Sequence, residues 1–106
     1  MRVYIAGPYT LGDVVENVRE AINAGEIVAL EGHEVFIPHL THFWHFVHKH
    51  SWEFWMHQDL SWLRCCDALI RLEGESKGAD IEVREAEKLG IPIYYSPHEF
   101  LRSIHR

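Results

Sequence analysis

Two carboxylates stand where helical periodicity leads us to expect apolar side chains. Glu82 lies in the stretch SKGADIEVREAEKLG, beside Val83 and one turn before Ala86. Asp59 falls in the middle of an apolar stripe in a second predicted helix. An unpaired buried charge is costly, so carboxylates at such positions are usually paired, protonated or functional. Glu82 and Asp59 are therefore either hydrogen-bonded braces of their helices or reacting groups of a catalytic site.

A pair of carboxylates suits a retaining glycosyl transfer. In that reaction one carboxylate attacks the anomeric carbon, and another group assists the leaving base. Glu82 is the candidate nucleophile, because a position near the start of a helix would help to keep it ionised. Periodicity alone leaves the purely structural alternative open.

Ser76 and Gly78 precede Glu82 in the same stretch. Ser76 is a candidate N-cap of the helix, and Gly78 frees the backbone where the loop enters the helix. The Ser76 hydroxyl and the amides that follow it could also bind a phosphate at the helix N-terminus. The two roles are compatible.

The segment 39–57 is dense in histidine and aromatic residues. One hypothesis is a metal cluster built from closely spaced histidines: His39, His42, His45, His48 and His50. However, the chain has no HExxH motif and no paired-cysteine motif. The interleaved aromatic residues favour a base-stacking wall or a subunit interface instead. We therefore expect no metal ion and no organic cofactor.

Apolar patterning predicts the elements that must position these residues. Strands are expected at 2–6, 34–37, 67–72 and 91–95, and helices between 13 and 32, at 51–66, 76–90 and 98–105. Strands that alternate with helices imply right-handed crossovers and a parallel sheet. The fold class expected is α/β: one domain over 1–106, a small three-layer sandwich with a parallel sheet of about four to five strands, Rossmann- or flavodoxin-like.

Ligands of such folds bind outside the carboxyl ends of the strands. Three loops should converge there, namely 7–12, the chain from Pro38 onward, and 73–78. They add four candidate substrate-binding residues to Ser76 and Gly78: Gly7, Tyr9, Thr10 and His39.

Composition narrows the possible partners and location. The formal charge of −6 and the lack of a basic run argue against binding to a nucleic-acid polymer. Adjacent Cys65 and Cys66 cannot form an ordinary disulfide framework, and no signal peptide or membrane-length apolar run is recognised, so we expect a cytoplasmic protein. Four Trp and five Phe exceed what so small a core readily hides, which favours a homodimer or higher homo-oligomer.

Three motifs, in order along nearly the whole chain, resemble the nucleoside 2-deoxyribosyltransferase superfamily and its branch of nucleotide 5'-monophosphate N-glycosidases. YIAGPYT is similar to the family's first strand and glycine turn, and QDLSWLRCCDALI to its central helix and the aspartate that follows. The spacing of Gly78, Glu82, Ala86 and Gly90 is similar to its catalytic motif. The chain looks closest to short bacterial and phage members.

The resemblance implies that Glu82 forms a glycosyl-enzyme ester, that Asp59 assists the leaving base or holds the sugar and base, and that Tyr4 orients Glu82. Ser76 stands where the monophosphate hydrolases carry a phosphate-binding serine, which favours a nucleotide substrate and hydrolysis over base transfer. The segment 8–10 departs from the phosphate loop of that branch. The expected function is cleavage of the N-glycosidic bond of a nucleoside 5'-monophosphate or nucleoside. The alternatives are a non-catalytic nucleotide-binding or sensing module and a histidine-rich metal-binding protein.

Overall fold

Four parallel strands form one sheet in the computed structural model, which describes residues 1–104. The strands are β1 (Arg2–Ala6), β2 (Glu34–Phe36), β3 (Ala68–Arg71) and β4 (Ile93–Tyr94), in the spatial order β2-β1-β3-β4. In the register of the sheet, Val3 of β1 pairs with Val35 on one side and Ala68 on the other. The chain therefore reverses its winding direction between β1 and β3, where folds of this kind bind ligands.

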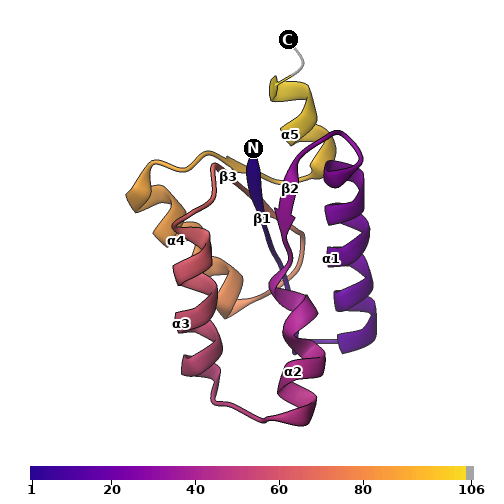
Figure 1. Ribbon diagram of the computed structural model, residues 1–106, viewed down its shortest axis with the longest axis vertical. Helices are drawn as coiled ribbons and strands as arrows, with labels where there is room; N and C mark the ends of the chain where they lie inside the picture. The colour runs from indigo at the N-terminus through magenta and orange to yellow at the C-terminus, as the bar shows by residue number, and fades with distance from the viewer. Residues whose placement is uncertain (105–106) are drawn as a thin grey trace.

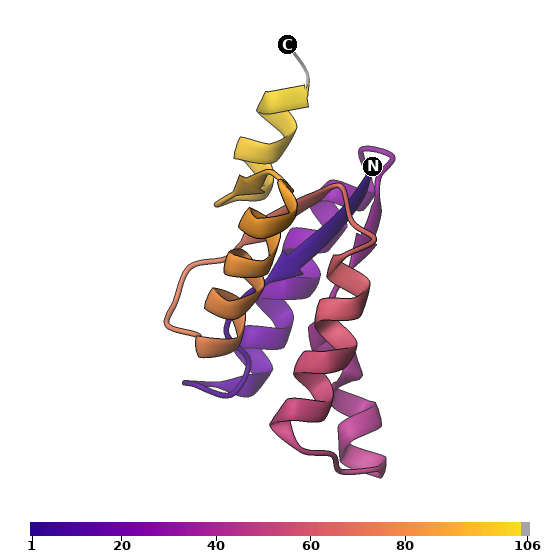
Figure 2. The ribbon, with the colours of Figure 1, turned by 90° about the vertical axis from the view of Figure 1, so that its left-hand side faces the viewer.

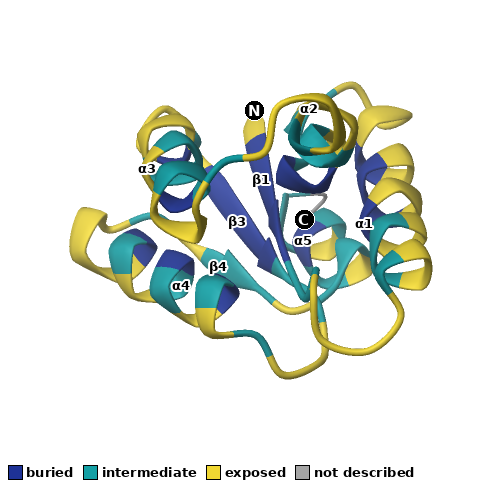
Figure 3. Cartoon of the chain, turned by 90° about the horizontal axis from the view of Figure 1, so that it is seen from below, coloured by how far each residue is buried: buried dark blue, intermediate teal, exposed yellow. Residues whose placement is uncertain are grey.

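Helices cover both faces of the sheet. Helices α1 (Val14–Ala29) and α5 (Pro97–Ile104) lie on one face, and α3 (Trp52–Leu63) and α4 (Lys77–Leu89) on the other (Figures 1 and 3). Figure 2 shows α3 and α4 side by side in front of the sheet. The predicted three-layer α/β sandwich is confirmed.

Two apolar clusters, one on each face, form the core. Alternate residues of β1 point to opposite sides, so Val3 and Ile5 join the cluster under α1 and α5, while Tyr4 and Ala6 join the one under α3 and α4. Among these four side chains of β1, that of Tyr4 carries a polar group. Its side chain enters the layer between the sheet and α4, the helix that carries Glu82.

Side-chain caps fix where the site helices begin. Ser51 Oγ accepts a hydrogen bond from Phe54 N at 3.1 Å at the start of α3, and Ser76 Oγ accepts one from Ala79 N at 3.1 Å at the start of α4. Gly90 ends α4 in the left-handed region, with φ of 72°. The predicted capping role of Ser76 is confirmed.

The segment after β2 folds as two short helices. The 3-10 helix η1 (Pro38–Thr41) leads into α2 (His42–Val47), which extends past the end of the sheet near the start of α3 (Figure 1). These helices carry three of the six histidines of the segment 39–57 to the carboxyl end of the sheet, namely His39, His42 and His45.

Some expected boundaries and stripes were wrong. Strand β4 is shorter than 91–95, since Pro92 has no N–H to donate to the sheet. Leu89, Trp62 and Trp52, expected in apolar stripes, are 49%, 54% and 47% exposed, whereas Leu63 in the same turn as Trp62 is fully buried. Helix α5 begins at Pro97, and His105, which the prediction included, lies outside the described residues. Within residues 1–104 no helix has the length and apolar character needed to cross a membrane.

Candidate active site

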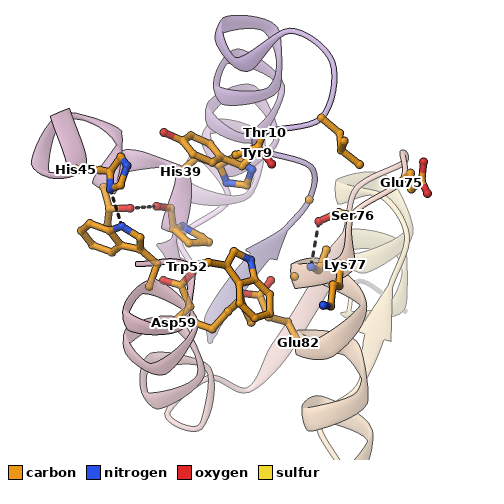
Figure 4. A pocket seen from close by; sticks show the side chains of 18 of the residues that line it. Tyr9, Thr10, His39, His45, Trp52, Asp59, Glu75, Ser76, Lys77 and Glu82 are labelled. Carbon is orange, nitrogen blue, oxygen red and sulfur yellow. Dashed lines mark hydrogen bonds between the residues drawn. The ribbon is translucent and has the colours of Figure 1, made fainter. Parts of the chain in front are cut away.

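A cavity of about 540 Å³ lies at the carboxyl ends of β1, β2 and β3. Its wall contains eight of the nine residues that the sequence nominated: Gly7, Tyr9, Thr10, His39, Asp59, Ser76, Gly78 and Glu82. The ninth, Tyr4, lies beneath the wall and reaches the cavity through Glu82. In Figure 4, His45 marks one end of the cavity and Ser76 and Lys77 the other, with Asp59 and Glu82 between them.

Tyr4 holds the carboxyl group of Glu82. The fully buried Tyr4 hydroxyl donates a hydrogen bond to Glu82 Oε2, linking β1 to α4 across 78 residues of sequence. Burial, followed by the nearby Glu82 carboxyl, raises the pKa of Tyr4 well above its usual value, so the phenol stays a donor at neutral pH. The Tyr4 ring stacks on Phe36 with a centroid distance of 5.5 Å, which restricts its movement. Glu82 is therefore held in one orientation.

Burial keeps the Glu82 carboxyl mostly protonated at neutral pH. Its side chain is only 4% exposed, and this burial raises its pKa to about 8. The Tyr4 hydrogen bond and the positive charge of Arg71 oppose the shift, while Asp59 adds to it. We expected the helix start to keep Glu82 ionised, and that expectation was wrong. Glu82 lies in the second turn of α4, beyond the reach of the helix dipole, so loss of solvation dominates.

Asp59 supplies a second perturbed carboxyl on the same cavity. Burial raises its pKa to about 7, and its Oδ1 atom accepts no hydrogen bond from any residue in 1–104. Glu82 and Asp59 thus titrate close together, and near neutral pH the pair holds one to two protons. One carboxyl can then act as a base or nucleophile while the other acts as an acid.

The N-terminus of α4 forms the opposite end of the cavity. Because Ser76 Oγ accepts the capping hydrogen bond, its hydroxyl proton remains free to be donated to a ligand. Gly78 lies where a Cβ atom would come within 3.3 Å of Met56 Sδ, so glycine allows α3 and α4 to approach closely here.

Sequence reasoning missed Lys77 as a site residue and named Trp52 only as part of a base-stacking wall or a subunit interface. Both line the cavity, with the Lys77 ammonium 5.2 Å from the centre of the Trp52 ring. A lysine directly after a candidate phosphate-binding serine was the available signal for Lys77.

The histidine and aromatic segment forms a wall of interlocked rings. Trp55 Nε1 donates to His45 Nδ1 at 2.8 Å, and the His50 ring stacks on Phe54 with centroids 3.8 Å apart. In the described part of the chain, no three His, Cys, Asp or Glu side chains are grouped to hold a metal ion. His45, His50 and Trp55 line the cavity, where they contact other rings.

The loop after β1 is tied to this wall. The Tyr9 hydroxyl is hydrogen-bonded to His42 Nδ1, and His39 Nε2 lies 2.9 Å from the carbonyl oxygen of Pro8. Asn17 Nδ2 donates to the carbonyl oxygens of Tyr9 and Leu11 at 3.0 and 2.8 Å. The loop therefore has a defined shape that brings Gly7, Tyr9 and Thr10 to the cavity.

A protein-family model described as a domain of unknown function, DUF4406, matches residues 1–95. The chain belongs to the DUF4406 family. Among solved structures, this DUF4406 chain is similar to a 2-deoxyribosyltransferase from the psychrotolerant bacterium Bacillus psychrosaccharolyticus, with a TM-score of 0.70 and 23% sequence identity. The match covers 88% of the DUF4406 chain and 69% of the other chain, and shows that the two share a fold. No curated protein matches the sequence.

The DUF4406 cavity combines three chemical regions. It has an end formed by the Ser76 hydroxyl and the Lys77 ammonium, with the Glu75 carboxylate beside them, a pair of carboxyls in the middle, and a wall of aromatic and imidazole rings. Its volume is in the range of small-molecule sites, about 300–1,000 Å³. A ligand with an anionic group at one end and a flat polar ring at the other would complement all three regions.

Proposed function

We propose that this DUF4406 protein cleaves the N-glycosidic bond of a nucleoside 5'-monophosphate or nucleoside through a covalent glycosyl-Glu82 intermediate. The observation that carries the proposal is the buried Glu82 carboxyl, held by the Tyr4 hydroxyl beside Asp59 on one cavity. The name of the structural neighbour, a 2-deoxyribosyltransferase, supports a nucleoside as the substrate class.

The reaction would proceed in two displacements. The ionised Glu82 carboxylate attacks C1', the bond between C1' and the base nitrogen breaks with its electron pair leaving on the base, and protonated Asp59 gives its proton to that nitrogen. Asp59, now ionised, takes a proton from water, whose oxygen attacks C1' and displaces Glu82. A second base in place of water would give base transfer. We favour hydrolysis, because the resemblance at Ser76 points to the hydrolase branch.

The test of this function is product formation. A panel of nucleosides and their 5'-monophosphates would be incubated with the protein at about pH 8, with and without a second base, and free base would be measured by chromatography. We expect release of base from at least one monophosphate. Products in the presence of the second base separate hydrolysis from transfer.

A non-catalytic nucleotide-binding module is the second candidate. The raised pKa of Glu82 favours it, because a protonated carboxyl is a poor nucleophile. This candidate predicts that a nucleotide binds tightly while no base is released at any pH. That result would refute the proposed catalysis.

Tyr4→Phe should weaken catalysis without unfolding the protein. Loss of a hydrogen bond to a charged group costs about 1.5–3 kcal/mol, so we expect a fall of about 10-fold to 100-fold in kcat/KM. Since the Tyr4 hydrogen bond lowers the pKa of Glu82, the acidic limb of the pH–rate profile should move to higher pH. Tyr95→Phe, at an exposed tyrosine, is the control. An unchanged rate and limb in Tyr4→Phe would show that Tyr4 does not position Glu82.

Ser76→Ala should separate the capping role from a phosphate-binding role. We expect a loss of about 1 kcal/mol in stability from the missing cap. The ratio of kcat/KM for a 5'-monophosphate to that for its nucleoside should fall by about tenfold, because one hydrogen bond to a charged phosphate is lost.

Ser51→Ala is the matched control, since Ser51 makes the same 3.1 Å capping bond at α3 and does not line the cavity. It should cost similar stability and leave the ratio unchanged. Equal ratios in the two variants would leave Ser76 with only its capping role.

Self-association stays a prediction. Apolar side chains exposed on α2 support it: Phe43, Phe46 and Val47, of which Phe46 is 82% exposed.

A further inference from the structure

His39 is a buried residue, and one of its two ring nitrogens is hydrogen-bonded within the protein. Its side chain belongs to η1 and is only 4% exposed. Nε2 lies 2.9 Å from the carbonyl oxygen of Pro8. A carbonyl oxygen can only accept, so Nε2 carries the hydrogen.

The other ring nitrogen, Nδ1, has no partner. Burial lowers the pKa of His39 against the opposing effect of the Pro8 and Gly7 carbonyl oxygens, so the ring is neutral near pH 7, and its single proton is on Nε2, against the Pro8 oxygen. Nδ1 therefore carries a lone pair, and it accepts no hydrogen bond from residues 1–104. An unsatisfied buried acceptor is unfavourable and rare in folded proteins, so it needs an explanation.

The surroundings of His39 point to a ligand as the missing partner. The ring lines the cavity beside Tyr9 (Figure 4). In the described part of the chain, one other buried side-chain oxygen or nitrogen lacks a partner, and it is Oδ1 of Asp59 on the same cavity. Both unsatisfied atoms thus belong to a single site, as they would if one ligand completed both.

The tautomer of His39 is fixed by its setting. Moving the proton to Nδ1 would place the lone pair of Nε2 against the lone pairs of the Pro8 carbonyl oxygen. Buried Pro38 precedes His39 in the chain, and the Tyr9 ring packs edge-on at a centroid distance of 6.1 Å. The imidazole therefore keeps a buried, unsatisfied acceptor at Nδ1 within the wall of the cavity.

We propose that His39 is a specificity-determining residue whose Nδ1 accepts a hydrogen bond from an N–H or O–H group of the ligand. Ligands with an acceptor at that point are rejected, because two lone pairs would face each other in a buried site. The substrate class rests on the proposed function. Within it, the donor is an amino or ring N–H group of the base, or a hydroxyl of the sugar.

Two substitutions separate this role from a structural one. In His39→Gln the amide nitrogen can reach the place of Nε2 and keep the bond to Pro8, but the acceptor at the place of Nδ1 is lost. In His39→Asn the amide oxygen can take the place of Nδ1, but the bond to Pro8 is lost. Binding would be measured by calorimetry with the four common 2'-deoxynucleoside 5'-monophosphates, on a Glu82→Gln background that prevents turnover.

We expect His39→Gln to weaken binding of the best monophosphate by at least about tenfold, the effect of one hydrogen bond to a buried acceptor. His39→Asn should bind within about threefold of the parent, since it keeps the acceptor. The melting temperature should change in the opposite sense, with a fall in His39→Asn and little change in His39→Gln. Unaltered binding in His39→Gln would overturn the inference, and so would failure of all four nucleotides to bind the parent at millimolar concentration.

Ligand analogues then locate the donor. Analogues of the best nucleotide that lack either the N–H donor of the base or a sugar hydroxyl would be compared in the parent and in His39→Gln. The analogue without the relevant donor should bind the parent weakly and should no longer respond to His39→Gln. If every analogue responds equally, His39 does not read a ligand donor. Because these measurements concern binding, absence of base release would reject the proposed catalysis without deciding the role of His39.

Discussion

Glu82→Gln is expected to abolish base release and, at the same time, to stabilise the protein in alkaline solution. Removal of a covalent nucleophile should lower kcat by at least about a thousandfold. Glutamine has nearly the shape of the protonated acid, and its carbonyl oxygen can still accept the Tyr4 hydrogen bond. The loss therefore should not arise from unfolding.

The effect on stability follows from the raised pKa of Glu82. From its ordinary value of 4.5 up to about 8, the carboxyl is ionised in the unfolded chain and protonated in the folded one. The folded state then binds more protons, so stability falls as pH rises through this window. Glutamine does not titrate and escapes this loss. The variant should be more stable than wild type by about 1–3 kcal/mol near pH 9, the cost typical of an uncompensated buried polar group, and similar to it near pH 5.

Thermal unfolding across pH and a base-release assay would test both halves of this prediction. Glu87→Gln, at an exposed position of the same helix, is the control and should change neither quantity. A substrate analogue with fluorine at the 2-position of the sugar should add its glycosyl mass to Glu82 of the wild type and leave Glu82→Gln unmodified. Full base release by Glu82→Gln would rule out the covalent route.

Asp59 should determine the alkaline limb of a bell-shaped dependence of kcat/KM on pH. The Glu82–Asp59 pair titrates near 7 and near 8, and the reaction needs the single-proton form in which Asp59 holds the proton, which is the less populated one because the pKa of Glu82 is the higher. Below about 7 the second proton removes the nucleophile, and above about 8 loss of the last proton removes the acid. We expect kcat/KM to be highest between the two values.

Asp59→Asn should lower kcat/KM by about 10²–10⁴, the usual contribution of a general acid or base. It should also abolish the alkaline limb, because asparagine cannot lose the proton. The acidic limb should then report the titration of Glu82 alone and lie at or above its wild-type position, because Asp59 no longer contributes to the first proton lost by the pair. A substrate whose base leaves readily without protonation should suffer much less from the substitution. A bell that keeps both limbs in Asp59→Asn would assign the acid to another residue.

Much of this fold could be predicted because the sequence patterns that indicate its strands and helices involve residues close together in the chain. The apolar run of β1 ends where Gly7 and Pro8 interrupt it, and the observed strand has the predicted bounds, Arg2–Ala6. The caps of α4, Ser76 and Gly90, act on backbone groups a few residues away. Helical periodicity placed Glu82 on the buried side of α4, and its side chain lies there. The predictions failed for the burial of Leu89 and Trp62 and for the length of the edge strand β4.

The site depends on contacts that no local pattern encodes. Tyr4 and Glu82 are 78 residues apart, and the resemblance alone suggested that they act together. The ionisation of Glu82 was misjudged, because the depth of its burial depends on α3, α4 and the sheet closing over it. His39 could be nominated from its position after a strand, but its free Nδ1 became visible only once Pro8 was found against Nε2.

The sequence by itself determined the α/β class and the nomination of Glu82, since periodicity and caps involve residues close together in the chain. The tertiary structure alone decided the protonation and the hydrogen bonding of the site residues. The proton on Glu82, its hydrogen bond from Tyr4 and the acceptor left free on His39 all arise from groups distant in sequence. Solvation and hydrogen bonding depend on every atom within a few ångströms, and that neighbourhood exists only after the chain has folded.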